Sequence, residues 1–376
     1  MVFHQCGICR ARCAGACLPR PRAFLAGQRR ASLQGGNIMN DIIAPVRWGI
    51  LGAARIADGA IIPGLVKSAV CEPLAIGARS VERARTMADR HGIQRAYGSY
   101  EEVLADPDVE AVYIALPNHL HVEWTRKAAK AGKHVLCEKP AAMTAAELDQ
   151  LGDIDPALKI SEAFMVRQQP RWIRLRQILQ SEDYGRPLSF SSLLSFMMTN
   201  EADFRQKPEF GGGAYYDLGC YTAMAARYVF GSEPKRAFAA AAHNAGGIDM
   251  FTSVILDFGD GRHATFMVSM AQASSQSIQI VCERAFISLP QAYVPSRVSP
   301  NIIAIDTSAD HANSDIHTLE FPPLDQYEEE VTNFSRAIRG EAVPYFDMRD
   351  ARANAAVADA VFASAKSGAW VDVKGH

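Results

Sequence analysis

Cys137, Glu138, Lys139 and Pro140 directly follow a short apolar run, residues 134–136, which the sequence predicts to be a buried strand. The carboxyl ends of strands in an open α/β sheet face the crevice that binds ligands. A lysine there can hold a carbonyl by its charge, or carry out acid–base chemistry once desolvation lowers its pKa. The alternative is a solvated surface lysine, because lysines are mostly exposed.

A second group of reactive side chains lies in residues 211–221, which begin with three glycines and contain Asp217 and Tyr221. Glycines let the chain turn sharply or pack closely before a helix. Asp217 and Tyr221 are four residues apart and share one helix face, where a carboxylate and a phenol can bind sugar hydroxyls and relay a proton. The alternative is an acid that favours the helix dipole and a tyrosine in the core.

The elements that must position these groups begin with a strand over residues 46–51 and a helix that continues to Leu65. The turn between them departs from G-x-G-x-x-G, since Ala54 and Ala57 replace the second and third glycines. Small residues there still let the backbone approach a pyrophosphate at the helix N-terminus, although a plain turn is the alternative. The cofactor-contacting residues expected here are Gly49, Gly52, Ala53, Ala54, Arg55 and Ile56.

The next strand, residues 73–78, leads into Arg79 and Ser80, with Arg83 one turn later. An NAD site favours an acid at this point for the ribose hydroxyls. Arginines and a hydroxyl suit a 2′-phosphate, so we predict NADP as the cofactor, with NAD as the alternative. The competing interpretation is that the arginines only solvate a helix face.

Helical patterns over 81–91, 100–105 and 119–131 alternate with strand patterns over 111–115 and 133–137. Repeated β-α units predict a parallel sheet with right-handed crossovers. The residues at its ligand edge include Leu116, Pro117 and Asn118, and His121 follows in the first helical turn. A cofactor contact through His121 competes with a purely structural role.

After Ile160 long alternating segments predict a largely antiparallel sheet with an open face that needs a cover. A helix is expected over 169–180, a polar loop over 301–318 and two closing helices over 325–339 and 349–367. The expected strands are 188–196, 236–242, 251–258, 264–270 and 277–282.

We therefore predict an α/β protein with an NAD(P)-binding Rossmann domain over residues 39–160. Residues 161–376 are expected to form a substrate-binding and oligomerisation α/β domain with a large, mostly antiparallel open sheet. Packing of the C-terminal helix back on the first domain is an open alternative.

Residues 1–38 contain six arginines and four cysteines but no acidic residue. The cysteine spacing matches no common zinc or iron–sulfur pattern, so no metal site is predicted. An export signal and an organelle transit peptide are alternatives. We favour a start of translation at Met39, since Gly35 and Gly36 can be encoded by a ribosome-binding sequence, which would make 1–38 a non-native or disordered leader.

A net charge of −2 gives no reason to expect a nucleic-acid or membrane partner. No apolar run is long enough for a membrane span. The four cysteines after residue 38 are scattered, which is consistent with a reducing cytoplasm.

From Val46 to Val373 the chain resembles the family of glucose–fructose oxidoreductase, inositol dehydrogenase and their relatives. The order and spacing of five motifs carry the resemblance. They are the glycine turn at 49–57, Pro117-Asn118-x2-His121, Glu138-Lys139-Pro140, Glu162-Ala163-Phe164-Met165-x-Arg167 and Gly211–Tyr221.

The resemblance implies hydride transfer between a nicotinamide and a sugar-like carbon, and a homodimer or homotetramer formed through the C-terminal sheet. It implies that Lys139 is catalytic, that Glu138 lies near the nicotinamide ribose and that Asp217 binds substrate. Arg167 joins the expected cofactor-binding residues. Inositol dehydrogenases have a histidine at the position of Tyr221, so this chain resembles the glucose–fructose oxidoreductase, xylose dehydrogenase and dimeric dihydrodiol dehydrogenase branch.

We hypothesise that Tyr221 exchanges a proton with the substrate hydroxyl of a sugar, polyol or diol while a cationic Lys139 lowers the tyrosine pKa from about 10. Asp217 would orient the substrate. Residues 203–205 resemble a segment that approaches the active site in this branch. Two alternatives stay open, a non-catalytic nicotinamide-binding sensor or scaffold and a glycosidase that uses tightly held NAD.

Overall fold

The structure, a computed structural model, describes residues 44–309 and 312–375. These residues belong to one compact unit that contains a six-stranded and a nine-stranded sheet. The domain boundary at residue 160 stays a prediction, because both sheets belong to this unit. The predicted leader over 1–38 lies outside the described residues.

The six-stranded sheet is parallel throughout, with the order β3-β2-β1-β4-β5-β6. Its central strands are apolar because helices cover both faces, and every residue of β4 is buried. The order reverses between β1 and β4, so their carboxyl ends form the switch point where such sheets bind ligands. The strands are β1 (Val46–Leu51), β2 (Cys71–Gly77), β3 (Arg95–Tyr97), β4 (Ala111–Ile114), β5 (His134–Cys137) and β6 (Ile160–Glu162).

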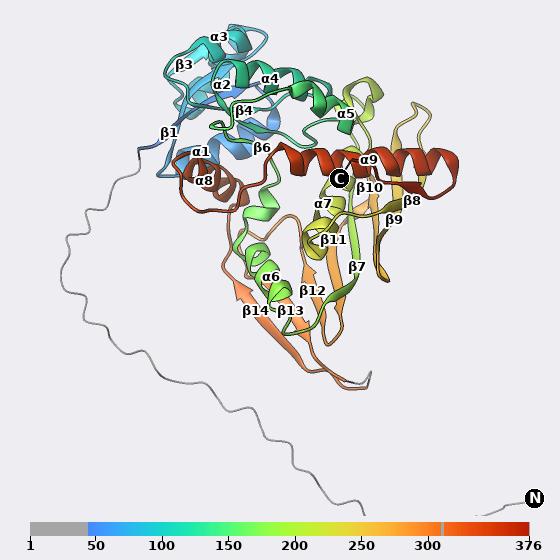
Figure 1. Ribbon diagram of the computed structural model, residues 1–376. Coiled ribbons are helices and arrows are strands. Elements are labelled where there is room, and N and C mark those ends of the chain that lie inside the picture. The colour runs from blue at the N-terminus through green and yellow to red at the C-terminus, as the bar shows by residue number, and fades with distance from the viewer. Residues whose placement is uncertain (1–43, 310–311, 376) are drawn as a thin grey trace, which may run out of the picture. The chain divides into compact units, whose positions relative to one another are not determined.

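Three of the helices around this sheet, α2, α3 and α5, begin at a capping serine or threonine. The Ser80 side chain accepts a hydrogen bond from the Arg83 amide at the start of α2. A helix from near the end of the chain, α8 (Gln326–Ile338), also packs here beside α1, with the Phe334 ring 5.6 Å from Trp48 (Figure 1). The other helices are η1 (Ala57–Ile61), α1 (Ile62–Lys67), α2 (Val81–His91), α3 (Tyr100–Ala105), η2 (Asn118–Leu120), α4 (His121–Lys130), α5 (Ala145–Leu148) and η3 (Asp149–Leu151).

The nine-stranded sheet has the order β14-β13-β12-β11-β7-β10-β9-β8-β15. All neighbouring strands are antiparallel except β7 and β10, which run parallel. The strands are β7 (Pro187–Met197), β8 (Arg236–His243), β9 (Asp249–Gly259), β10 (Arg262–Ser269), β11 (Ala271–Cys282), β12 (Phe286–Pro290), β13 (Asn301–Asp306), β14 (Ile316–Phe321) and β15 (Val371–Asp372).

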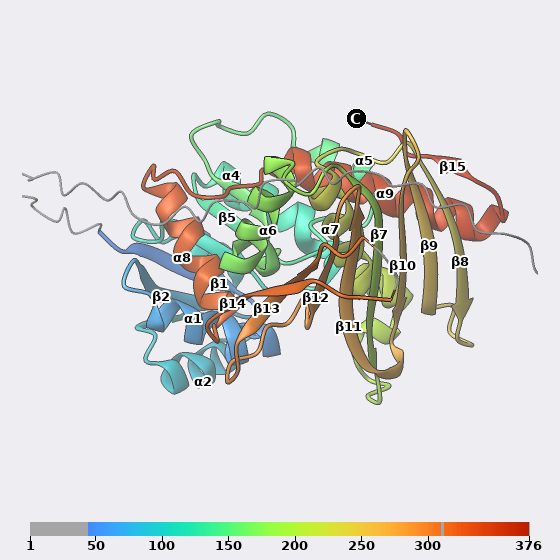
Figure 2. The same cartoon turned by 90° about the horizontal axis from the view of Figure 1, so that it is seen from below.

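Helices α6, α7 and α9 pack against one face of this sheet (Figure 2). Every residue of α7 is buried, as expected of a helix that is apolar on all sides. The helical elements here are η4 (Met165–Gln168), α6 (Pro170–Ser181), η5 (Phe204–Gln206), η6 (Pro208–Phe210), η7 (Tyr215–Gly219), α7 (Cys220–Phe230) and α9 (Met348–Ser367).

The predicted fold class is confirmed, but the predicted polar loop over 301–318 is wrong. This region contains β13 and the first half of β14, and the two strands pair from Asn301–Phe321 to Asp306–Ile316. Most residues of β14 are exposed, so backbone pairing at the sheet edge, and not apolar burial, forms this strand. Hydrophobic periodicity could not detect it.

In the described ranges, no helix combines the length and the apolar character needed to cross a membrane. Cys71, Cys137, Cys220 and Cys282 are buried and unbonded to one another.

Candidate active site

A cavity of about 520 Å³ opens at the carboxyl ends of β1, β4 and β5. The segment 203–213, η7, α7 and α8 supply its other walls. Ten of the residues predicted for the site line this cavity: Ala54, Arg55, Ile56, Leu116, Pro117, Asn118, Glu138, Lys139, Asp217 and Tyr221.

The turn after β1 fits the close approach of a phosphate group. Gly52 has φ +112°, and a Cβ there would lie 2.5 Å from the carbonyl oxygen of Ala115. The small Ala54 follows, and the first helical residues, Arg55 and Ile56, line the cavity. A helix N-terminus preceded by small residues presents unpaired amides to an anion, so this turn suits the pyrophosphate of a dinucleotide.

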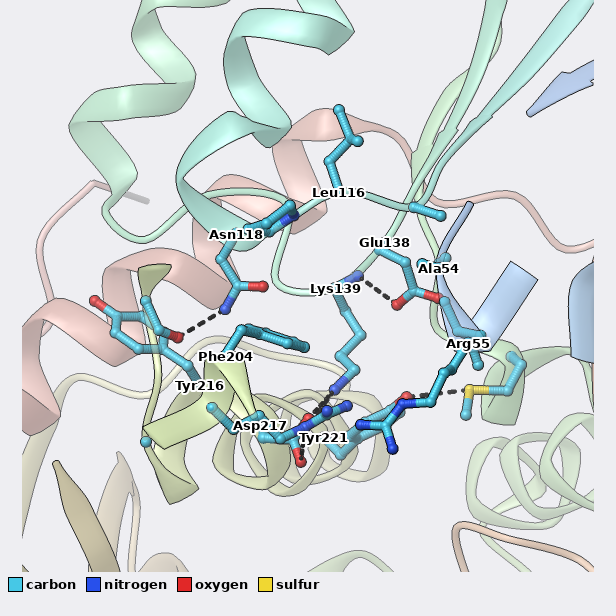
Figure 3. Close-up of a pocket in the computed structure, with 18 of the residues that line it drawn as sticks. Ala54, Arg55, Leu116, Asn118, Glu138, Lys139, Phe204, Tyr216, Asp217 and Tyr221 are labelled. Atoms are coloured by element: carbon cyan, nitrogen blue, oxygen red, sulfur yellow. Dashed lines mark hydrogen bonds and ion pairs between the residues drawn. The ribbon is translucent and has the colours of Figure 1, made fainter. Parts of the chain in front are cut away.

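Lys139 extends from the end of β5 across the cavity to η7 (Figure 3). Its Nζ donates hydrogen bonds to the carbonyl oxygen and to Oδ1 of Asp217, both at 2.8 Å. Burial alone would lower the pKa of Lys139, but its neighbours, Asp217 foremost, together outweigh burial and raise this pKa. Lys139 is therefore a cation in this structure and not a neutral base.

Asp217 contacts a second cation, since Arg205 Nε lies 3.0 Å from its Oδ2. Burial acts to raise the pKa of Asp217, but Lys139 and Arg205 together hold it at about 2. Arg205 also pairs with Asp203 at 3.2 Å, and Asp203 pairs with Arg55. A chain of ion pairs therefore connects the turn after β1 with Lys139.

Tyr221 lies next to Lys139, whose Nζ is 4.9 Å from the centre of the tyrosine ring. The phenol donates a hydrogen bond to Sδ of Met165 at 3.2 Å. Burial, reinforced by neighbours such as Glu138, raises the pKa of Tyr221 well above its ordinary value. The expectation of a lowered Tyr221 pKa is wrong for this structure, because burial of the phenol is the largest effect on it. Tyr221 is thus a neutral phenol that can donate a proton.

The glycines before η7 set the position of Asp217 and Tyr221. Gly213 has φ +122°, and a Cβ there would lie 2.0 Å from Oδ1 of Asp249. Oδ2 of Asp249 accepts a hydrogen bond from the Tyr215 amide at 2.8 Å, which anchors the start of the helix. The four-residue spacing then brings Asp217 and Tyr221 to the same cavity, as predicted from the helix period.

His121 is buried behind the cavity wall and does not line the cavity. Its Nδ1 and Nε2 each lie 2.7 Å from a carbonyl oxygen, of Pro140 and Leu116 respectively. The ring therefore joins the end of β4 to the Glu-Lys-Pro segment, which supports the alternative of a structural role, and the cofactor contact stays a prediction. Asn118 does line the cavity, and its Nδ2 donates to the Gly211 carbonyl at 2.8 Å.

The buried side chain of Arg167 pairs with Asp350, and its guanidinium lies 3.7 Å from the centre of the Phe346 ring, so its cofactor contact also stays a prediction. Arg79 and Arg83 are exposed beyond β2, away from the cavity, and their contact with a 2′-phosphate stays a prediction. The predicted residues that do not line the cavity are Gly49, Gly52, Ala53, Arg79, Ser80, Arg83, His121 and Arg167.

Helix α8 supplies two lining side chains, Tyr327 and Glu330, that sequence reasoning missed. They are three residues apart and therefore share a helix face. This spacing is the signal in the sequence that could have identified them as a pair. However, the acidic run 328–330 reads as a solvated surface, and acids are seldom buried.

Two stretches of the chain match descriptions of known families. Residues 46–158 match the oxidoreductase family with an NAD-binding Rossmann fold. Residues 172–288 match the GFO/IDH/MocA C-terminal domain.

The chain is 39% identical over 331 residues to an uncharacterised oxidoreductase, ORF334, of Rhizobium meliloti, an alignment that covers 87% of this chain and 99% of the relative. It is 36% identical to D-xylose 1-dehydrogenase (NADP(+)) 2 of Haloferax volcanii, with 87% and 99% covered. The solved structure of KijD10, a 3-ketoreductase from Actinomadura kijaniata in complex with NADP and TDP-benzene, superposes with a TM-score of 0.77 at 26% identity, covering 85% of this chain and 98% of KijD10. The chain therefore belongs to the Gfo/Idh/MocA family of oxidoreductases, with an NAD-binding Rossmann fold.

Proposed function

We propose that this protein is an NADP-dependent dehydrogenase or reductase that acts on a carbinol or carbonyl carbon of a sugar or a related polyol or diol. The observation that carries the proposal is the convergence of Lys139, Asp217 and Tyr221 on the cavity that begins at the dinucleotide-type turn after β1. The named relatives support a sugar-like substrate, since one is a D-xylose dehydrogenase and another a ketoreductase.

The bound nicotinamide would supply or accept the hydride. Tyr221 holds its phenolic proton in a buried site and gives it to the substrate oxygen during reduction, or takes it back during oxidation. The Lys139 cation stabilises negative charge on that oxygen, and Asp217 accepts hydrogen bonds from substrate hydroxyls. Because Asp217 keeps Lys139 charged, the two act as one unit.

The choice of NADP is supported by the segment after β2. Arg79 and Arg83 are exposed there, and Ser80 lies between them, so all three are accessible to a ribose phosphate. The xylose dehydrogenase and KijD10 carry NADP in their descriptions. A strong preference for NAD would overturn this part of the proposal.

The test is reduction of NADP⁺ and NAD⁺ in parallel across aldoses, polyols and trans-diols. Lys139→Ala and Tyr221→Phe should each lower turnover by ~10²–10⁴-fold, the usual contribution of a positioned acid or base. Tyr228→Phe is the matched control, because this phenol lies in the same helix but donates to the Trp172 carbonyl outside the cavity. Full turnover in both site variants would refute the assignment.

We also propose that two or four copies associate through the nine-stranded sheet. The support is a shallow hollow on the sheet lined by Phe238, Ile255, Met267 and neighbouring side chains. Light scattering on the wild type and on Ile255→Arg tests this, since a buried charge would dissociate the oligomer. A monomeric wild type would exclude it.

A further inference from the structure

We propose that Glu330 binds the carboxamide group of the nicotinamide as a protonated carboxylic acid. This inference rests on the proposed function, since it concerns the same cavity and cofactor. It assigns a direct cofactor contact to α8, a helix far in sequence from the dinucleotide-type turn.

Glu330 is placed for such a contact. Its residue is only 4% exposed, yet its side chain lines the main cavity together with Glu138 and Lys139. Glu330 also lines a small inner cavity of about 10 Å³ on its other side. The side chain therefore forms part of the wall between the two spaces and reaches into the one that opens at β1 and β4.

The carboxyl group of Glu330 has no partner in residues 44–309 and 312–375, where neither a hydrogen bond nor an ion pair involves it. Arg167, the cation that acts on the Glu330 carboxyl, is paired with Asp350. Glu138 already accepts hydrogen bonds from Tyr113 and from the Lys139 amide. Buried polar groups are nearly always hydrogen-bonded, so an unpaired carboxyl that faces a cavity indicates a missing ligand.

The surroundings also decide the form of this carboxyl. Burial, with the like charge of Glu138, raises the pKa of Glu330 well above its ordinary value, and Arg167 only partly opposes this. The titratable groups around Glu330 are Tyr113, Glu138, Glu162, Arg167, Tyr327 and Tyr345, and the cations Lys139 and Arg205, both paired with Asp217, line the same main cavity. None of them supplies an uncommitted positive charge, so a neutral acid is the stable form.

A neutral carboxylic acid is the chemical complement of a primary carboxamide. The acid presents one O–H donor beside one C=O acceptor, and the amide presents one N–H donor beside one C=O acceptor. The two groups can therefore form a pair of hydrogen bonds in one ring. A ribose hydroxyl would use only one of them, so cofactor analogues can distinguish the two ligands.

The experiment measures NADPH binding by fluorescence titration for the wild type, Glu330→Gln and Glu330→Leu, with Glu329→Gln as the matched control. Glu329 is the preceding residue of α8 and does not line the cavity. We expect roughly tenfold weaker binding for Glu330→Leu, as for the loss of one to two hydrogen bonds. Glu330→Gln keeps a donor and an acceptor and should restore most of the affinity.

Two further readouts separate recognition from structure. Wild-type binding should weaken at alkaline pH as Glu330 ionises, while Glu330→Gln should show no such loss. The 3-acetylpyridine analogue of NADP⁺ lacks the amide donor. The wild type should therefore bind the analogue more weakly than NADP⁺, whereas Glu330→Leu should bind the two ligands with equal affinity. Two outcomes would overturn the inference while leaving the proposed function intact. Glu330→Leu and the wild type would prefer NADP⁺ over the analogue by the same factor, or Glu330→Gln would lose affinity for NADPH at alkaline pH as the wild type does. A wild type that binds no nicotinamide dinucleotide would overturn both.

Discussion

The cavity has two acidic walls whose carboxyl groups take opposite protonation states. On one wall Asp217 is held by Lys139 and Arg205, which keep its pKa at about 2. On the other wall Glu330 has no cation of its own, and burial raises its pKa well above the ordinary value. The pKa values of two similar side chains are therefore shifted in opposite directions, because only Asp217 forms ion pairs with cations.

The difference suggests a division of labour within one site. A charge-compensated carboxylate can accept several hydrogen bonds from hydroxyl groups, as expected of a sugar-binding wall. A neutral acid can donate as well as accept, as expected of a wall that recognises an amide. Glu138 lies between the two walls and is bonded to Tyr113 and to the Lys139 amide.

The wall where Lys139 and Arg205 pair with Asp217 is called the compensated wall below, and the wall with Glu330 the uncompensated wall. The strongest way to break the comparison is to remove the anion from the compensated wall. Asp217→Asn leaves the nearly buried Lys139 without its carboxylate, while Arg205 keeps Asp203, and losing one partner of a buried ion pair costs about 3 kcal/mol or more. Turnover should fall with it by at least ~10²-fold, because Lys139 is no longer held across the cavity. Urea unfolding and steady-state rates measure the two effects.

The pH dependence of this loss is a further check on the Asp217 wall. The pKa of Asp217 is lowered in the folded state, so its stabilisation is present above its ordinary value of 3.8 and disappears as the pH falls toward 2. The stability difference between wild type and Asp217→Asn should therefore shrink across this range. A difference that stays constant from pH 7 to pH 2 would mean that Asp217 is not held as an anion by its neighbours.

The uncompensated wall makes the opposite prediction at Glu162, which lines the inner cavity behind Glu330. Burial raises the pKa of Glu162 to about 7, and its Oε2 has no hydrogen-bond partner in the described residues. Ionisation of the wild type above pH 7 then costs stability, at most about 3 kcal/mol for a shift of this size. Glu162→Gln should therefore be the more stable protein by about 1–3 kcal/mol at pH 8.

Thermal unfolding at several pH values tests the sign of the Glu162 effect. Below about pH 4.5 Glu162 is protonated in both the folded and unfolded states, so the two proteins should have equal stability there. The advantage of Glu162→Gln should appear between pH 4.5 and 7 and remain constant above. Destabilisation by Glu162→Gln at pH 8 would contradict the assignment of an uncompensated acid.

Sequence reasoning located the compensated wall but not the other one. Lys139 follows a strand, and Asp217 and Tyr221 share a helix face, so local periodicity was enough to place them at one crevice. The pKa of Tyr221 could not be predicted in the same way, because its direction depends on how deeply the phenol is buried in the folded protein. Residue spacing carries no signature of that burial.

Glu330 was missed for a different physical reason. The acidic run 328–330 has the composition of a solvated helix face, and only the packing of α8 against the parallel sheet, where the Trp48 and Phe334 rings are neighbours, turns Glu330 inward. β14 is a similar case, since its exposed residues carry no apolar pattern and its pairing with β13 makes it a strand. Contacts between distant segments decided both.

The smallest predicted effect concerns Arg55, whose ion pair with Asp203 links the turn after β1 to the compensated wall. The Arg55 side chain is 81% exposed, so Arg55→Gln should change the free energy of unfolding by less than about 1 kcal/mol. If Arg55 contacts the pyrophosphate, the same change should weaken NADPH and NADH about equally, by roughly tenfold for one charge-assisted hydrogen bond. Arg83→Gln is the matched comparison, because a residue that reads the 2′-phosphate should weaken NADPH alone. Equal affinities of Arg55→Gln and the wild type for both cofactors would mean that Arg55 pairs with Asp203 and does not contact the pyrophosphate. The chain of ion pairs would then serve the compensated wall only.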